Sequence, residues 1–333
     1  MTIETSWSGP EAAKGSPTNE IPELASLLAF SEEHRDDPRF GLTLEILWQQ
    51  VLDADPGHDE ARARVERYAA RREALDARHA EWFAALPSFL VKKVNGSKDR
   101  APFLRVGQSV AQLLAAEIPN LAGARHVLDF GVGLSRVLWP LSQALPEAVF
   151  TGFDVDPGML HHSRSLGTLP PDRFVHTTRN IPDGSVDATY VISVFTHLGD
   201  TTDYWLSEIH RMLSPRGHAF VTYHDETLYA DLRAKGEIPR ATPATCVERV
   251  LLGPGVEGST QLATFYSTAH WETLLRRFFV VEKTAPRGLH GNQSYSVVRK
   301  RDVEIDRATL RAEYLGALED ELFRLREAKK LLF

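Results

Sequence analysis

A glycine turn preceded by an acidic residue is the part of the sequence best suited to bind a ligand. It lies in residues 126–141, which read HVLDFGVGLSRVLWPL. The apolar run before Asp129 predicts a strand, and the apolar run from Val137 predicts a helix. Gly131 and Gly133 lack a Cβ, so the backbone between them can turn sharply and offer its N–H groups to a ligand. Asp129 would then place a carboxylate at the carboxyl end of the strand, where open α/β sheets bind ligands.

A second acidic residue narrows the kind of ligand. Asp154 ends the next apolar run, about 20 residues beyond Gly131, where a carboxylate can accept both hydroxyls of a ribose. Arg136 stands where a dinucleotide fingerprint has its third glycine, which disfavours close docking of a pyrophosphate. Asp129 is poorly placed for a pyrophosphate and well placed for an ammonium group. The pattern therefore favours a nucleoside that carries an amino acid over one that carries phosphates.

Segments with strand character alternate with helical segments through the middle of the chain. After the glycine turn, strands are expected at residues 148–154, 173–177, 188–194 and 218–223, and helices at 157–166 and 203–213. This alternation is typical of βαβ units and a mainly parallel sheet. A helix at 268–277 precedes two more strands, at 278–283 and 294–299, with no helix between them. The sheet is therefore expected to end in an antiparallel pair.

The two ends of the chain are expected to lie outside this α/β domain. Residues 1–20 are rich in Ser, Thr, Gly and Pro, which predicts a disordered tail. Residues 21–86 are expected to form a helical N-terminal extension, residues 87–301 the α/β domain with a loop-like stretch at 87–108, and residues 302–333 a C-terminal helix. The leucine spacing of this last helix suits packing against the extension or, alternatively, a homodimer formed through the terminal helices.

Composition excludes several classes of protein. The chain has 333 residues and a net charge of −7, which argues against a general binder of nucleic acid or of anionic membranes. Its one cysteine, Cys246, excludes an internal disulfide framework and a cysteine-based zinc cluster, and no metal site is expected. No apolar run approaches the roughly 20 residues that span a bilayer, and no signal-peptide pattern opens the chain. A cytoplasmic protein is expected.

Four successive motifs resemble those of class I S-adenosylmethionine-dependent methyltransferases. They read VLDFGVGLSR, GFDVDPGML, GSVDATYVISVFTHL and EIHRMLSPRGHAFVTYH. The resemblance extends over about residues 87–301 and implies a Rossmann-like α/β sheet of seven strands, the last one antiparallel. The SVFTHL run, together with VNGSKDRAPFLRVGQ and GNQSYSVV, is similar to a bacterial subgroup often found with glycosyltransferases and cell-surface polysaccharide assembly.

This resemblance implies that S-adenosyl-L-methionine is the cofactor and indicates the residues that would hold it. The glycine turn and its preceding acid would line the methionine part, and Asp154 would take the ribose hydroxyls with Val155 beside the adenine. The segment around Asn180 and Ile181 would border the adenine ring. The expected cofactor-binding residues are Asp129, Phe130, Gly131, Val132, Gly133, Ser135, Asp154, Val155, Asn180, Ile181 and Val194.

Two histidines are candidates for the catalytic base. Methyl transfer is an in-line displacement that mainly requires alignment and exclusion of water, and a hydroxyl nucleophile also benefits from a base that removes its proton. His197 and His224 follow the fourth and fifth expected strands, at the edge where open sheets present ligands. Each can be that base, or can serve only to bind backbone groups.

The sequence thus predicts an S-adenosylmethionine-dependent methyltransferase that acts on oxygen of a sugar, a glycan or another small metabolite. Methyl transfer follows from the motifs, whereas the sugar follows only from analogy with the subgroup. One alternative is an NAD(P)-dependent oxidoreductase on a related sheet, against which Asp129 and Arg136 count. A second alternative is a non-catalytic scaffold that keeps a cofactor pocket.

Overall fold

The computed structural model describes residues 48, 51–52, 55–67, 86–95, 98, 100–253, 257–258 and 261–330. The chain divides into two compact units, Met1–Leu113 and Leu114–Phe333. The tail expected at residues 1–20 and most of the extension expected at 21–86 lie outside the described residues. The domain boundaries expected from the sequence therefore stay predictions.

In the first unit, a turn at residues 56–57 precedes the helix that begins at residue 59. The Gly57 N–H donates to the Asp55 side chain at 3.0 Å, and the His58 ring accepts from the Ala61 N–H at 3.2 Å. Residues 59–67 then form a helix, and the Arg64 guanidinium lies 5.1 Å from the centre of the buried Trp48 ring. This part of the extension is helical, as expected.

The expectation of a loop-like stretch at residues 87–108 is wrong. Two helices occupy this region, α4 (Ser88–Asn95) and α5 (Arg100–Glu117). Pro102 is the third residue of α5, in the first turn, where the backbone N–H has no partner inside the helix and its loss costs nothing. The prolines of this segment therefore mark helix starts and not a loop.

The sheet follows the predicted topology. Its strands are β1 (His126–Phe130), β2 (Val149–Phe153), β3 (Phe174–Val175), β4 (Val186–Val191), β5 (Leu213–Asp225), β8 (Phe279–Leu289) and β9 (Gln293–Lys300). The first five strands are parallel, in the order β3-β2-β1-β4-β5. Strand β9 pairs antiparallel with β5 and with β8, which confirms the expected antiparallel end; these seven strands and two further ones form a sheet of nine.

A further hairpin lies at the carboxyl end of β5. It consists of β6 (Arg249–Leu252) and β7 (Ala263–Tyr266), which pair antiparallel. Strand β7 runs parallel to the last residues of β5, with His224 opposite Phe265 and Asp225 opposite Tyr266. This hairpin and α9 (Glu226–Ala234) lie in the long connection after β5, where no strand was expected. The insertion places additional backbone beside one of the candidate histidines.

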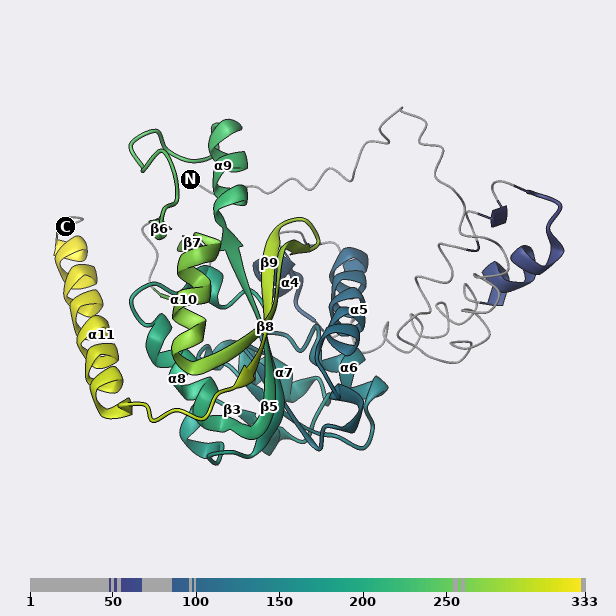
Figure 1. The fold of residues 1–333 in the computed structure, drawn as a ribbon, viewed down its shortest axis with the longest axis horizontal. Helices are drawn as coiled ribbons and strands as arrows, with labels where there is room; N and C mark the ends of the chain where they lie inside the picture. Colours follow the sequence, from purple (N-terminus) through teal and green to yellow (C-terminus); the bar gives the residue numbers. More distant parts are fainter. Residues whose placement is uncertain are drawn as a thin grey trace. The chain divides into compact units, whose positions relative to one another are not determined.

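Helices cover both faces of the sheet (Figure 1). They are α6 (Leu138–Ala144), α7 (Pro157–Ser165), α8 (Thr202–Met212) and α10 (Thr268–Phe278), and α11 (Arg307–Lys330) follows the last strand. Helix α7 begins as its sequence predicts, because Pro157 occupies the first turn and the Asp156 side chain accepts from the N–H groups of Gly158 and Met159.

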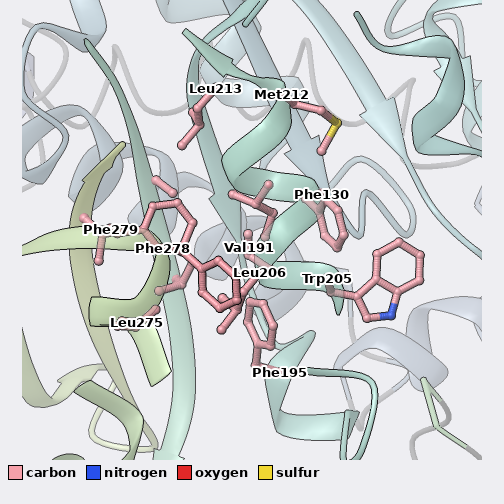
Figure 2. Packing of buried hydrophobic residues seen from close by; sticks show 14 of the residues in the cluster. Phe130, Val191, Phe195, Trp205, Leu206, Met212, Leu213, Leu275, Phe278 and Phe279 are labelled. Atoms are coloured by element: carbon pink, nitrogen blue, oxygen red, sulfur yellow. The ribbon is translucent and has the colours of Figure 1, made fainter. Parts of the chain in front are cut away.

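The main hydrophobic core lies between the sheet and helices α8 and α10. Figure 2 shows Phe130 and Val191 from the strands meeting Trp205 and Leu206 of α8 and Leu275 of α10. The Trp205 ring packs at 5.6 Å from the Phe130 ring and belongs to the core. This packing fixes the carboxyl ends of β1 and β4, between which the strand order reverses and ligands bind in such sheets.

Helix α11 packs on α8 through its first turns. The Tyr314 ring stacks on the Tyr204 ring with centres 4.1 Å apart, and Leu310 is buried in the main core. Leu315, one of the residues of the predicted leucine stripe, is 48% exposed. A homodimer through the terminal helices stays a prediction. Neither α11 nor any other described helix is long and apolar enough to cross a membrane.

Candidate active site

The glycine turn after β1 is held tightly against the chain that follows β4. The N–H groups of Gly131 and Val132 both donate to the Phe153 carbonyl, at 2.8 and 2.9 Å. Gly131 has a φ of +88°, and a Cβ added there would lie 2.4 Å from the Val194 side chain. The position therefore requires glycine for its backbone and for its close approach to Val194. The structure thus brings together Gly131 and Val194, two of the residues expected to bind the cofactor.

Asp154 is fixed at the end of β2 by main-chain donors. Its Oδ2 accepts from the Gly133 N–H at 2.8 Å and its Oδ1 accepts from the Asp156 N–H at 2.9 Å. The carboxylate is half-buried, and the next residue, Val155, is 55% exposed. Each carboxylate oxygen can accept a further hydrogen bond, so this acid is a preorganised acceptor for paired hydroxyls beside an apolar surface.

Asp129 is buried at the end of β1, and burial raises its pKa to about 8. The nearby Asp154 carboxylate raises this pKa further, whereas the Tyr190 hydroxyl and the Arg136 guanidinium lower it. The side chain is therefore largely protonated at neutral pH. A ligand cation placed beside it would favour the ionised form and release the proton. Tyr190, on the neighbouring strand β4, was not expected from the sequence as part of this site.

Arg136 joins the glycine turn to a distant part of the chain. Burial lowers its pKa to about 10, and the Asp129 carboxylate opposes this shift. His290, in the turn between β8 and β9, has its pKa lowered by burial and by Arg136. The tip of the β8–β9 hairpin consequently lies within electrostatic reach of the first turn after β1. The sequence interpretation gave Arg136 only the negative role of excluding a pyrophosphate.

Several expected cofactor-binding residues have buried side chains. Phe130 and Ile181 belong to the main core, and Val132 is 4% exposed. Ser135 is fully buried with a φ of +58°, and its hydroxyl accepts from Thr168 at 3.5 Å. Phe130 and Ile181 can therefore present only main-chain atoms to a ligand. Their side chains pack in the main core and hold the backbone of the site in place.

The segment expected to border the adenine is held by Arg211, near the end of α8. The Arg211 guanidinium donates to the carbonyls of Thr178 and Ile181, both at 2.8 Å. It also forms ion pairs with Asp183 at 2.6 Å and Glu208 at 2.9 Å. Arg211 and these four partners (Thr178, Ile181, Asp183 and Glu208) are hereafter called the Arg211 network. Asn180 lies on the exposed side of the segment, so the network fixes the backbone from which Asn180 projects.

The two candidate histidines lie together. His197, in the short helix after β4, donates from Nδ1 to the Leu262 carbonyl at 2.6 Å, and burial lowers its pKa. Burial lowers the pKa of His224 to about 3; His197 adds to this shift, whereas Asp225 and a hydrogen bond to the Thr264 backbone oppose it. Because a carbonyl only accepts, the Nδ1 of His197 carries the proton and its Nε2 has a free lone pair.

Other polar residues at the end of β5 are engaged in structural contacts. Asp225 accepts from Ser294 and, at 2.8 Å, from the Leu228 N–H at the start of α9. Glu226 accepts from the N–H and the hydroxyl of Thr268, at 2.8 and 3.0 Å, where α10 begins. These carboxylates therefore organise helix starts around the site.

Ser193 and Gln293 are neighbours of the site that the sequence did not indicate. The Gln293 amide donates to the Ser193 hydroxyl at 2.7 Å. Ser193 has a φ of +59° and directly precedes Val194, which touches the glycine turn. Positive φ values in non-glycine residues cluster at functional sites, but no local sequence pattern marks this one. Only the pairing of β9 with β5 brings the two residues together.

Comparison with known proteins identifies the type of domain. Residues 128–219 match the profile of a family described as "Methyltransferase domain". The chain is 27% identical over 116 residues to a tRNA1(Val) (adenine(37)-N6)-methyltransferase of Porphyromonas gingivalis, a match that covers 34% of this chain and 44% of that protein. The chain spans less than half the length of the curated relatives that it matches.

Solved structures of methyltransferases are also similar to this chain. The 1,6-didemethyltoxoflavin-N1-methyltransferase of Burkholderia thailandensis, solved with S-adenosylhomocysteine, is 19% identical with a TM-score of 0.44, over 67% of this chain and 90% of that chain. A TehB-like S-adenosylmethionine-dependent methyltransferase of Corynebacterium glutamicum is 18% identical with a TM-score of 0.37, over 57% of this chain and 86% of that chain.

Residues 128–219 thus match a methyltransferase domain, and the parallel strand order with an antiparallel end is that of a Rossmann-like sheet. The residues at the sheet edge fit S-adenosylmethionine, the cofactor that the sequence motifs imply. Gly131 has no Cβ, which allows the turn to approach Val194 closely. The buried Asp129 carboxylate suits a cation, and the Asp154 carboxylate has the lone pairs to accept ribose hydroxyls.

Proposed function

We propose that the protein transfers a methyl group from S-adenosylmethionine to a hydroxyl oxygen of a small-molecule or glycan acceptor. The observation that supports this most is the position of His197. It lies shortly after Val194, which contacts the glycine turn, and its Nε2 is free to accept a proton. A neutral base beside a cofactor turn is what methylation of a hydroxyl group needs.

In this proposal the ends of β1, β2 and β3 hold the cofactor. Asp129 binds the α-ammonium group, Asp154 binds the ribose hydroxyls, and Val155 with Asn180 flanks the adenine. When bound, S-adenosylmethionine supplies a methyl group activated by its sulfonium charge. The fixed main chain at Gly131 orients this end of the ligand without reorganisation, which is how an enzyme of this kind lowers a displacement barrier.

His197 is the base in this proposal and His224 assists it. The Nε2 of His197 takes the acceptor's hydroxyl proton as the oxygen becomes methylated. His224, with a pKa of about 3, is too weakly basic to compete for that proton at neutral pH. It remains uncharged and keeps the surroundings of His197 free of a second positive charge.

The net charge and the matched relatives both bear on the class of acceptor. The net charge of −7 disfavours a polyanionic acceptor, although one curated relative is a tRNA methyltransferase. We therefore assay methyl transfer from tritiated S-adenosylmethionine to three pools: nucleotide sugars and free glycosides, hydroxylated small metabolites, and total tRNA. Labelling of either small-molecule pool, lost in His197→Ala, is the expected result. Labelling of tRNA alone would contradict the proposed acceptor.

The raised pKa of Asp129 predicts a pH-dependent affinity for S-adenosylhomocysteine. The ligand's ammonium group favours ionised Asp129, so its binding lowers a pKa that is about 8 in the free protein. Below pH 8 binding must therefore release a proton, and affinity should rise up to about tenfold per pH unit between pH 6 and pH 8. Calorimetry in two buffers of different ionisation enthalpy measures the released proton.

The matched control for this effect is Asp129→Asn, which keeps the shape and cannot ionise. Its affinity for S-adenosylhomocysteine should be weaker at pH 8 and nearly independent of pH. If the wild-type protein exchanged no proton on binding at pH 6.5, Asp129 would not be the partner of the ammonium group.

The two histidine variants should differ in turnover, measured with whichever acceptor the three-pool assay labels. His197→Ala should lower turnover by about 100-fold or more, the usual worth of a positioned base, and leave affinity for S-adenosylhomocysteine nearly unchanged. His224→Ala should cost about tenfold, because it only supports His197. Wild-type turnover should fall as the pH drops through the lowered pKa of His197, because protonation removes the free lone pair.

Steady-state kinetics of both variants, with the exposed His161→Ala as control, check this ranking. A larger loss in His224→Ala than in His197→Ala would reverse the assignment of the base.

A further inference from the structure

The β6–β7 insertion is not one of the seven strands of the methyltransferase sheet, yet it makes many contacts near the candidate base. The insertion here means strands β6 and β7 with the described residues Glu257, Gly258 and Leu262. Its contacts converge on the turn 197–202, which begins with His197 and leads into α8.

Two charged side chains of the insertion bind the main chain of the turn from both sides. The Arg249 guanidinium donates to the Gly199 carbonyl at 2.7 Å and to the Asp200 carboxylate at 2.6 Å. The Glu257 carboxylate accepts from the N–H groups of Gly199 and Thr201, at 2.9 and 3.3 Å, and from the Thr201 hydroxyl. Charge-assisted hydrogen bonds of this kind are stronger than neutral ones.

Main-chain groups of the insertion bind His197 itself. The Gly258 N–H donates to the His197 carbonyl at 2.8 Å, and the Leu262 carbonyl accepts from its ring at 2.6 Å. The Tyr266 hydroxyl donates to the Leu198 carbonyl at 3.1 Å. The insertion therefore fixes the backbone position of His197 and the orientation of its ring together.

We propose that the β6–β7 insertion positions the base of the proposed methyl transfer, with Arg249 and Glu257 as its positioning residues. The inference rests on the proposed role of His197. Neither side chain touches the ring; they hold the turn at the distance from Leu262 that lets Nδ1–H donate to the carbonyl. That bond sets the tautomer, and the tautomer leaves Nε2 unprotonated and able to act.

The test reads the tautomer of His197 and needs no acceptor. Two-bond ¹⁵N–¹H correlation spectra of the full chain report which ring nitrogen carries the proton, and the signals lost in His197→Ala assign the residue. The wild-type protein should show the Nδ1–H tautomer and a pKa below 6.5, with His224, Arg249 and Glu257 as the nearby ionisable groups. Glu257→Ala should show a mixture of tautomers and a pKa shifted back toward 6.5.

Acylation of the ring by diethyl pyrocarbonate, located by peptide mapping, gives a second measurement. Glu257→Ala should raise the acylation rate of His197 by about tenfold, because loss of charge-assisted bonds favours opening of the turn. Glu257→Gln should behave nearly like the wild type, since its amide oxygen can accept the same N–H groups. The exposed Glu237→Ala is the matched control and should change neither signal.

An unchanged tautomer and acylation rate in folded Glu257→Ala would overturn the proposal. If that variant fails to fold, Arg249→Lys takes its place, because an ammonium group lacks the planar fork with which the guanidinium reaches Gly199 and Asp200 from two nitrogens, and it should give an intermediate result. Affinity for S-adenosylhomocysteine is measured in the same samples. If the wild-type protein does not bind S-adenosylhomocysteine, the proposed function is refuted. If it binds and the His197 tautomer in Glu257→Ala is unchanged, only this inference is refuted.

Discussion

Replacing Arg211 by alanine is expected to lower the free energy of unfolding by about 3–5 kcal/mol, the cost of breaking a buried ion pair from one side. The variant leaves Glu208, which is 9% exposed, with the Thr178 hydroxyl at 2.6 Å as its remaining partner within the Arg211 network. It also removes the donors from the Thr178 and Ile181 carbonyls. Thermal and urea unfolding of the ligand-free protein measure the change, with a fall in Tm of about 10 °C.

Two further variants separate the ion pair from general damage. Arg216→Ala removes an exposed arginine a few residues along the same chain and should change stability by less than about 0.5 kcal/mol. The double variant Arg211→Met with Glu208→Gln removes both charges and should recover part of the loss, because no charge is then buried alone. Equal stability of Arg211→Ala and the wild type would show that this network does not hold the segment.

Gly131→Ala is expected to weaken binding of S-adenosylhomocysteine by at least about 100-fold, since overpacking a fixed loop costs on the order of 1–3 kcal/mol and also displaces its donors. The added Cβ would lie 2.4 Å from the Val194 side chain at a φ of +88°. Relief requires movement of the turn or of Val194, and both border the proposed cofactor site. Calorimetric titration measures the loss.

Gly167→Ala is the matched control for backbone strain. Gly167 has a φ of +67°, and nothing lies within 4 Å of an added Cβ. It should lose stability on the order of 1 kcal/mol and keep its affinity for S-adenosylhomocysteine. Adding Val194→Ala to Gly131→Ala removes the steric conflict and should restore part of the affinity. Unchanged affinity in Gly131→Ala would place the ligand elsewhere.

Local signals in the sequence were sufficient for the sheet and for the turn after β1. Apolar runs of strand length, a proline after Asp156 and the glycines at 131 and 133 each act within a few residues, so their pattern is visible along the chain. The antiparallel end was predictable because no helix separates the last two strands. The expected loop at 87–108 rested on the turn signal Asn95-Gly96, and Asn95 is the last residue of α4, so the signal marks the end of a helix and not a long loop.

The polar contacts around the site were not predictable in the same way. Arg211 donates to the Thr178 carbonyl and Gln293 donates to Ser193, and each pair is far apart in the sequence. Only the tertiary fold brings these residues together. The insertion was missed because β7 pairs with just the last residues of β5 and has little hydrophobic periodicity of its own. Both histidines could be proposed from the sequence, but not the burial that lowers the pKa of His224 to about 3 or the Leu262 carbonyl that fixes the tautomer of His197.

The central claim is that the carboxyl edge of this sheet holds S-adenosylmethionine, and one calorimetric comparison tests it most directly. The full chain is titrated with S-adenosylhomocysteine and with NAD, in the wild type and in Asp154→Ala. We predict binding of S-adenosylhomocysteine with a Kd of about micromolar order, no measurable binding of NAD, and loss of affinity by about tenfold or more in Asp154→Ala, because the ribose hydroxyls lose their acceptor. Binding of NAD without binding of S-adenosylhomocysteine would contradict the account.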